Sequence, residues 1–166
     1  MKISDGFWLN KPGYNVNYAT QMYEIEADEN SITVYATNQW IANRGMTLGG
    51  PMITVRFTPT LKDSIKVTVE HYSESLKKAP AFGLNEDVSF KPVINKLENG
   101  GYELISGKTK VKIGGEKSGW DVSYWYGDRL LTKSGWRTTS LIEKEEWFAN
   151  NQRTAETGSR FFAKCD

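Results

Sequence analysis

Acidic residues gather at three points of the sequence where a pair of carboxylates could carry general acid and base chemistry. These are Asp28 with Glu29, Glu86 with Asp87, and Glu143 with Glu145 and Glu146. Two carboxylates across a cleft, about 5 to 5.5 Å apart for a retaining reaction, can cleave a glycosidic bond. Each cluster lies in a turn or polar connection, where hydrated acids are the usual state. We therefore predict that none of the three is catalytic.

Other nucleophiles and bases are few. His71, the single histidine, ends the apolar face of a predicted strand, which favours a core-edge residue with one hydrogen bond over a general base. Cys165, the single cysteine, lies next to the C-terminus, a poor position for a nucleophile. One cysteine and one histidine exclude an internal disulfide and a Cys/His metal set, although an Asp/Glu site for a hard cation stays open. We expect no catalytic residue and no cofactor.

Aromatic residues are dense between positions 120 and 148 and are the best candidates for a binding surface. Alternation in "WDVSYWY" places four side chains on one face, the predicted core face: Trp120, Val122, Tyr124 and Tyr126. Trp125 points to the opposite face, where it can be partly buried, contact another domain or stack on a sugar ring. Trp136 and Trp147 are further candidates for a sugar or domain contact.

Composition and charge limit the classes of protein to which the chain can belong. A chain of 166 residues with 39% apolar residues, six Trp, eight Tyr and seven Phe is typical of one globular, aromatic-rich domain. Twenty-one basic and twenty acidic residues leave a net charge of +1, which excludes the strong attraction that nucleic-acid binders use. No apolar run reaches the roughly 18 residues of a membrane span. With no secretory signal after Met1, we expect a cytoplasmic protein.

Short alternating runs recur about every ten residues and predict antiparallel strands. The clearest are "SITVYA", "MITVRF" and "IKVTVEH". "YELISGKTKVKI" predicts a hairpin turning at Ser106-Gly107, and "GWDVSYWYGDRLLTKSGW" predicts one turning at Gly127-Asp128. Lysines at 108, 110 and 112 could bind an anionic glycan, but they are more typical of an exposed or edge strand protected against pairing.

Two further segments complete the prediction. "SLIEKEEWFANNQ", with Ser140 as a candidate cap, is a helical turn or a loop. The opening "MKISDGFWLNKPG" predicts turns around Asp5 and at Lys11-Pro12-Gly13, with Trp8 as a core or interface anchor. About ten strands with almost no helix predict an all-β fold, an antiparallel β-sandwich.

The order of these segments resembles the N-terminal domain of glycoside hydrolase family 31. The resemblance rests on "MKISDGFWLNKPG", "PMITVRF" with "IKVTVEHY", "YELISGKTKVKI" leading into "GWDVSYWYGDRLLTKSG", and "NNQRTAETGSRFF". Within the family, the opening segment "MKISDGFWLNKPG" is most similar to bacterial α-xylosidases. The resemblance implies a galactose-mutarotase-like sandwich ahead of a catalytic (β/α)₈ barrel that carries the two catalytic aspartates. No stretch here resembles the family's "DFGE"-type nucleophile segment.

The resemblance thus implies that residues 1–166 are a single N-terminal sandwich domain, incomplete at its C-terminal end and without the barrel. Its expected partners are the barrel of the parent enzyme and, through the parent, an α-linked oligosaccharide. Alone it should be inactive, and an uncovered edge strand should favour a homo-oligomer. A free-standing carbohydrate-binding module is the alternative, with Trp125, Trp136 or Trp147 as the stacking surface.

Overall fold

Strands make up nearly all the regular structure in the computed structural model of the chain. It describes residues 3, 9–71, 87 and 89–144, and the backbone of 146–147, 153–154 and 160–161. Within these residues the helical structure is one short 3₁₀ turn, η1 (Arg44–Leu48). Asp5, Trp8 and Cys165, which the sequence singles out, lie outside the described residues.

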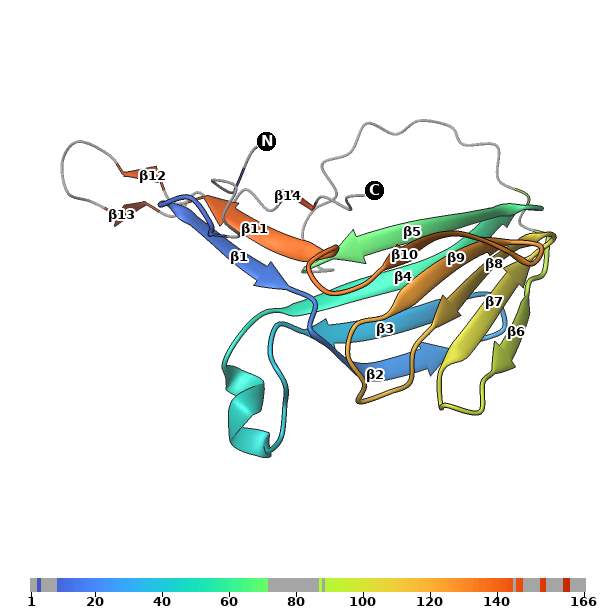
Figure 1. Cartoon of the computed structure of the whole chain (residues 1–166), viewed down its shortest axis with the longest axis horizontal. Coiled ribbons are helices and arrows are strands. Elements are labelled where there is room, and N and C mark those ends of the chain that lie inside the picture. The colour runs from blue at the N-terminus through green and yellow to red at the C-terminus, as the bar shows by residue number, and fades with distance from the viewer. Residues whose placement is uncertain are drawn as a thin grey trace.

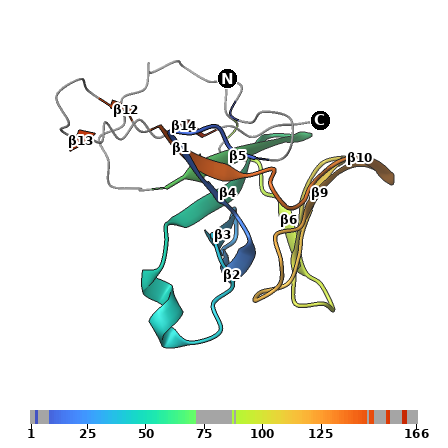
Figure 2. The ribbon, with the colours of Figure 1, turned by 60° about the vertical axis from the view of Figure 1, so that its left-hand side comes forward.

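Two antiparallel sheets face each other across the core (Figures 1 and 2). The first has the order β2 (Gln21–Ala27), β3 (Ile32–Thr37), β4 (Met52–Leu61) and β5 (Ser64–Glu70). The second has the order β10 (Arg129–Ser134), β9 (Val122–Tyr126), β8 (Thr109–Ile113), β7 (Tyr102–Ser106) and β6 (Val93–Lys96). The prediction of an all-β, antiparallel sandwich is confirmed.

Two smaller sheets lie beside the sandwich (Figure 1). In the larger, β11 (Ser140–Lys144) pairs with β1 (Tyr14–Tyr18) on one side and β14 (Arg160–Phe161) on the other. In the smaller, β12 (Glu146–Trp147) pairs with β13 (Arg153–Thr154). The first and last of the longer strands, β1 and β11, are therefore direct neighbours.

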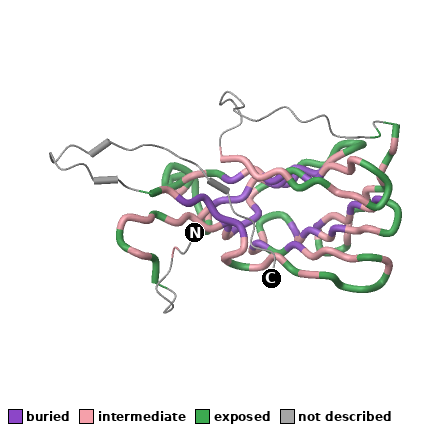
Figure 3. The backbone as a smooth tube through the Cα atoms, turned by 90° about the horizontal axis from the view of Figure 1, so that it is seen from above, coloured by how far each residue is buried: buried purple, intermediate pink, exposed green. Residues whose placement is uncertain are grey.

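The core forms where the apolar faces of the two large sheets meet, as the buried stretches in Figure 3 show. Its fully buried side chains include Val34, Val55 and Phe57 from the first sheet and Leu104, Val111 and Val122 from the second. This confirms the alternation predicted for "SITVYA" and "MITVRF". In β5 it holds less well: Ile65 and Val69 pack on the core, but Val67 is 38% exposed because β5 is an edge strand.

Along the face that "WDVSYWY" was predicted to turn to the core, burial decreases toward the end of the strand. Trp120 and Val122 are buried, and Tyr124 packs against the core while partly exposed. Tyr126, the last residue of β9, is 46% exposed. The ring of Tyr126 therefore lies at the end of the sandwich and not inside it.

Three predicted turns are present, one with a shifted register. Tyr14 N donates to Lys11 O (3.2 Å) across Pro12 and Gly13, whose φ of 82° fits a type II turn. Gly127-Asp128 joins β9 and β10 as predicted, with Gly127 at φ 57°. The β7–β8 turn is Gly107-Lys108 and not Ser106-Gly107, because the glycine takes the positive-φ position.

One sequence interpretation is wrong, and a second is wrong in part. The segment after Ser140 is strand β11 and neither a helical turn nor a loop, because Leu141 and Ile142 are buried and its backbone pairs with β1. The lysine-rich strand β8 is the middle strand of its sheet, so the edge-strand prediction is wrong, whereas the exposed-strand alternative is not contradicted, because Lys108 is exposed and Lys110 and Lys112 are partly exposed. Lys110 Nζ lies 3.6 Å from an Asp128 oxygen, and Lys112 Nζ lies 3.5 Å from a Glu103 oxygen.

Hydrogen bonds between two hairpin turns join the large sheets at one end. Asp63, in the β4–β5 turn, accepts a hydrogen bond from Lys108 N through its carboxylate and one from Thr109 Oγ1 through its carbonyl (2.8 Å). The buried Ser106 hydroxyl donates to Leu61 O (2.8 Å). We call this contact the turn clasp.

Candidate functional site

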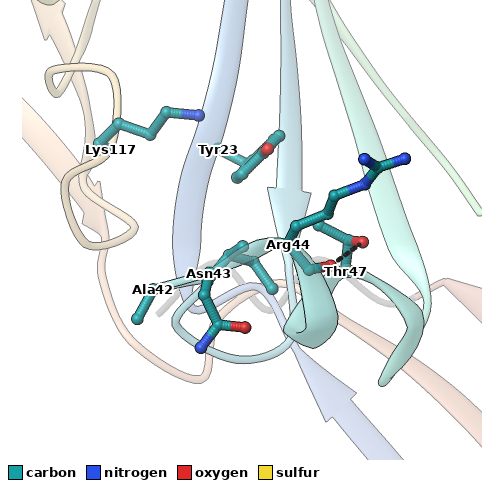
Figure 4. Close-up of a pocket in the computed structure, with 7 residues that line it drawn as sticks. Tyr23, Ala42, Asn43, Arg44, Thr47 and Lys117 are labelled. Atoms are coloured by element: carbon teal, nitrogen blue, oxygen red, sulfur yellow. Dashed lines mark hydrogen bonds between the residues drawn. The ribbon is translucent and has the colours of Figure 1, made fainter.

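A hollow of about 300 Å³ lies between two loops beside the edge strand β2 (Figure 4). One wall is the loop between β3 and β4, which contains η1, and the other is the loop between β8 and β9. The residues that line it are Tyr23, Ile41, Ala42, Asn43, Arg44, Thr47 and Lys117. We call it the Tyr23 hollow.

Tyr23 lies in the hollow because of a β-bulge. Met22 pairs with Ala36 and Glu24 pairs with Tyr35, so the pairing with β3 shifts at Tyr23. An extra residue of this kind bends a strand and changes the direction of its side chain. The Tyr23 ring lies under Lys117, whose Nζ is 3.3 Å from the ring centroid. This distance is a close cation–π contact.

The loop that carries Lys117 is held against β2 by backbone hydrogen bonds. Met22 N donates to Ser118 O (2.9 Å), and Lys117 N donates to Met22 O (2.7 Å). Trp120 N donates to Thr20 O (2.9 Å). Lys117 has a φ of 61°, a left-handed conformation that costs a non-glycine residue about 1–2 kcal/mol. The bonds on either side of Lys117 hold it in that conformation.

A buried glutamine ties the two walls together. Gln21 is 3% exposed, and its Oε1 accepts from Ile41 N (2.8 Å) while its Nε2 donates to Lys117 O (3.5 Å). The wall that contains η1 has its own hydrogen bonds: Gln39 Nε2 donates to Met46 O (3.0 Å), and Thr47 Oγ1 donates to Arg44 O (2.7 Å; Figure 4). Both walls are therefore fixed with respect to β2.

The charge around the Tyr23 hollow is positive. Two of its lining residues, Arg44 and Lys117, are cations, and none is Asp or Glu. Figure 4 shows the two cationic side chains on opposite sides of Tyr23. Thr47 lies on the same wall as Arg44, and the Asn43 amide points away from Tyr23, with its oxygen accepting from Gly45 N (3.0 Å). This arrangement suits an anionic group that also carries hydroxyls.

Among the predicted aromatics, Trp125 lies on the outer face of β9 and is half-buried. Its Nε1 donates to Ser123 Oγ (2.9 Å), and Lys112 Nζ lies 5.2 Å from its ring centroid. In the register it stands between Lys110 of β8 and Leu130 of β10. Part of the ring that a sugar would stack on is therefore covered by the protein's own side chains.

Trp136 is much more accessible, with 64% of its surface exposed. It lies in the turn between β10 and β11, and the guanidinium carbon of Arg137 is 4.2 Å from its ring centroid. Ser134 Oγ and Thr138 Oγ1, 2.6 Å apart, brace this turn, and Trp120 Nε1 donates to the same Ser134 oxygen (3.2 Å). Trp136 is thus an exposed ring on a firmly held turn.

The structure does not bring Trp125 and Trp136 together. Trp125 pairs with Leu130 near the turn of the β9–β10 hairpin, whereas Trp136 follows Ser134 at the hairpin's other end. Trp147 lies in β12, and its side chain is outside the described part. The role of all three as contact residues stays a prediction.

The described acidic residues hold turns and neighbouring strands. Asp28 accepts from the backbone N–H groups of Asn30 (2.7 Å) and Ser31 (2.6 Å), and the bond from Asn30 is the main cause of its lowered pKa. The hydroxyl and backbone N–H of Ser89 likewise lower the pKa of Asp87. Glu143 Oε2 accepts from Asn15 Nδ2 (2.9 Å) on the paired strand β1.

His71 and the possible metal ligands were the other residues that the sequence offered for chemistry. His71 Nδ1 lies 3.4 Å from Met52 O, which is a hydrogen bond of the kind expected for a histidine at the edge of the core. Over the described ranges, no three His, Cys, Asp or Glu side chains gather as metal ligands do. In those ranges we also find no helix with the length and hydrophobicity to cross a membrane.

Comparison with known proteins shows which proteins the chain is similar to. The chain matches no protein-family model. It is 25% identical over 154 residues to alpha-xylosidase XylQ of Lactiplantibacillus pentosus, a match that covers 92% of this chain and 20% of that protein. The chain is similar to alpha-xylosidases. A second, an alpha-xylosidase of Emericella nidulans, is 22% identical over 113 residues, covering 68% of this chain and 14% of the relative.

The resemblance to α-xylosidases drawn from the order of the segments is thereby confirmed. The chain spans a fifth or less of the length of these relatives. Sequence reasoning missed the Tyr23 hollow, because its residues come from three segments separated by about 20 and 70 positions. The local signals that could have pointed to its walls are the glycine-containing runs "NRGMTLGG" and "GGEKSG", which are typical of irregular loops.

Proposed function

We propose that this chain is a non-catalytic domain of an α-glycosidase of the α-xylosidase type, in glycoside hydrolase family 31. The parent enzyme would act on α-linked xylose or glucose in oligosaccharides. The observation that carries the proposal is the coverage: the match includes 92% of this chain but 20% of alpha-xylosidase XylQ. The catalytic barrel would then belong to the part of the relatives that the match leaves out.

The chemistry of the described carboxylates supports a non-catalytic role. A retaining glycosidase needs a general acid with a raised pKa beside an ionised nucleophile. The pKa values of Asp28 and Asp87 are instead lowered by hydrogen bonds within their turns. Both groups therefore stay ionised at neutral pH and stabilise local structure.

In this proposal the domain packs against the barrel and supports the region around the active site. Trp136 is a suitable contact residue, because its ring is 64% exposed and its turn is braced from the core by Ser134 and Trp120. Large aromatic rings on rigid supports are common anchors at such interfaces. Trp125, half-buried under Lys112, is a less suitable one.

The test is an assay of the 166-residue chain with an aryl α-xyloside, beside alpha-xylosidase XylQ as a positive control. We expect no hydrolysis above the buffer rate. An Asp28→Asn variant gives a matched sample from the same host. Hydrolysis by the purified chain that also survives inhibition of host glycosidases would contradict the proposal.

A carbohydrate-binding module is the second candidate, favoured by the exposure of Trp136. Titration with neutral xylo- and gluco-oligosaccharides would then give a signal that Trp136→Ala abolishes and Trp125→Ala leaves intact. Silence in this titration favours the packing role, because a buried domain contact needs no affinity for sugars.

A further inference from the structure

We propose that the Tyr23 hollow binds a single anionic sugar, a saccharide unit that carries a carboxylate or a phosphate. This site is distinct from the packing role proposed above and does not depend on it. Its ligand class follows from three features of the hollow: its charge, its polar lining and the way its walls are held.

The charge selects an anion. Arg44 and Lys117 approach the hollow from different loops, and no acidic residue lines it to neutralise them. A guanidinium can hold a carboxylate or phosphate through two parallel N–H···O bonds, and an ammonium adds a point charge. The contact with the Tyr23 ring keeps the Lys117 ammonium at the hollow and limits the other positions it can adopt.

The size and remaining lining select a sugar over a bare ion. A volume of about 300 Å³ is at the lower end for small-ligand pockets and suits one ring more than an extended chain. The Tyr23 hydroxyl can donate and accept hydrogen bonds with sugar hydroxyls, and the Thr47 hydroxyl, which donates to Arg44 O, can accept one. One face of the Tyr23 ring is covered by the Lys117 ammonium, 3.3 Å from the ring centroid, so the ring positions that cation.

The hollow also combines three features that usually destabilise a fold. A β-bulge at Tyr23, a left-handed φ of 61° at Lys117 and a buried polar side chain at Gln21 occur within this one region. Bulges and strained residues are frequent beside functional sites. Here all three act together to bring Tyr23 and Lys117 face to face.

The experiment is a calorimetric titration of the chain at constant ionic strength with glucuronate, glucose 6-phosphate, neutral glucose and inorganic phosphate. We expect a Kd on the order of 1 mM for at least one anionic sugar and much weaker binding of glucose and inorganic phosphate. A preference for glucuronate or for glucose 6-phosphate identifies which anionic group the site takes. Failure of both anionic sugars to bind, or equal binding of glucose, overturns the proposal. Inorganic phosphate binding as tightly as the sugar phosphate overturns its sugar component.

Variants locate the binding in the hollow. Arg44→Gln and Lys117→Gln each remove a charged hydrogen-bond donor and should weaken binding about tenfold or more. Lys91→Gln is the matched control, since Lys91 is an exposed cation paired with Glu29 (3.9 Å) that is not part of the lining. Gln21→Met keeps the side-chain volume but releases both walls, so it should also weaken binding. Equal affinities in the Arg44 and Lys91 variants would place the ligand elsewhere and refute the site.

Discussion

The turn clasp makes a quantitative prediction for Gly107→Ala. Gly107 has a φ of 60°, and a Cβ at this position would meet the carboxylate of Asp63, whose Cγ would be 2.9 Å away. That carboxylate is held by its hydrogen bond from Lys108 N. The alanine therefore suffers twice, first from its backbone conformation and then from the displacement of Asp63.

The two costs can be separated in magnitude. A left-handed conformation costs alanine about 1–2 kcal/mol relative to glycine. Displacing Asp63 weakens one exposed hydrogen bond to a charged group, for which about 1 kcal/mol is a reasonable value. We expect Gly107→Ala to lower the free energy of unfolding by about 2–3 kcal/mol.

Gly127→Ala is the matched control for this prediction. Gly127 holds the same first position in the neighbouring two-residue turn, at φ 57°, but a Cβ there would meet nothing within 4 Å. It should lose only the conformational part, about 1–2 kcal/mol. Calorimetric melting should then place Gly107→Ala about 2–4 °C below Gly127→Ala.

The Asp63→Gly background tests the cause. Glycine keeps the φ of 65° seen at Asp63 and removes the carboxylate. In that background Gly107→Ala and Gly127→Ala should cost the same free energy. The reasoning is refuted if the two alanine variants already melt together in the native background, or if Asp63→Gly leaves their difference unchanged.

Three further substitutions test other parts of the structure. Trp120→Ala should destabilise by about 3–5 kcal/mol in urea unfolding because Trp120 is 6% exposed, whereas Trp136→Ala, at a ring 64% exposed, should change stability by less than about 1 kcal/mol; equal effects would contradict the burial described. The lowered pKa of Asp28 stabilises the fold above its unfolded pKa of 3.8, and this contribution is lost as pH falls through the lower folded pKa. The unfolding free energy of Asp28→Asn should therefore fall less steeply than that of the native chain between about pH 5 and pH 2. Curves of unfolding free energy against pH that run parallel for the two proteins would exclude this contribution. Lys112→Gln should cost about 0.5–1 kcal/mol and shift the Trp125 fluorescence, because Lys112 lies over that ring and pairs with Glu103; an unchanged emission spectrum would argue against the contact.

Local patterns were enough to predict the sandwich and several of its details. The alternation around Val34 and Val55 identifies the core face, and Gly127-Asp128 identifies a hairpin turn, because both depend on neighbours in sequence. The β7–β8 turn was missed by one residue. Ser106 and Gly107 are both turn formers; the positive φ of Gly107 and the bond from the buried Ser106 hydroxyl to Leu61 O, 45 positions away, keep Ser106 in the strand.

Features that depend on distant pairing could not be predicted in this way. Ser140 followed by acidic residues is a reasonable helix start, but β1 supplies a partner from the other end of the chain and the segment becomes a strand. The lysines of β8 look like edge residues until the order of strands is known. The Tyr23 hollow likewise needs a bulge in β2 and a loop from the opposite sheet, neither of which has a local signature.

The pairing of β1 with β11 has a consequence for how the chain folds. Asn15 bonds to Glu143 across 128 positions of sequence, so β1 must wait for nearly the whole described chain before its partner exists. During synthesis both large sheets can form first from adjacent hairpins, because their strands are close in sequence. Closing such a long loop then comes late. Until β11 is made, the backbone N–H and C=O groups of β1 have no partner strand. During synthesis they are therefore open to pairing with strands of other nascent chains.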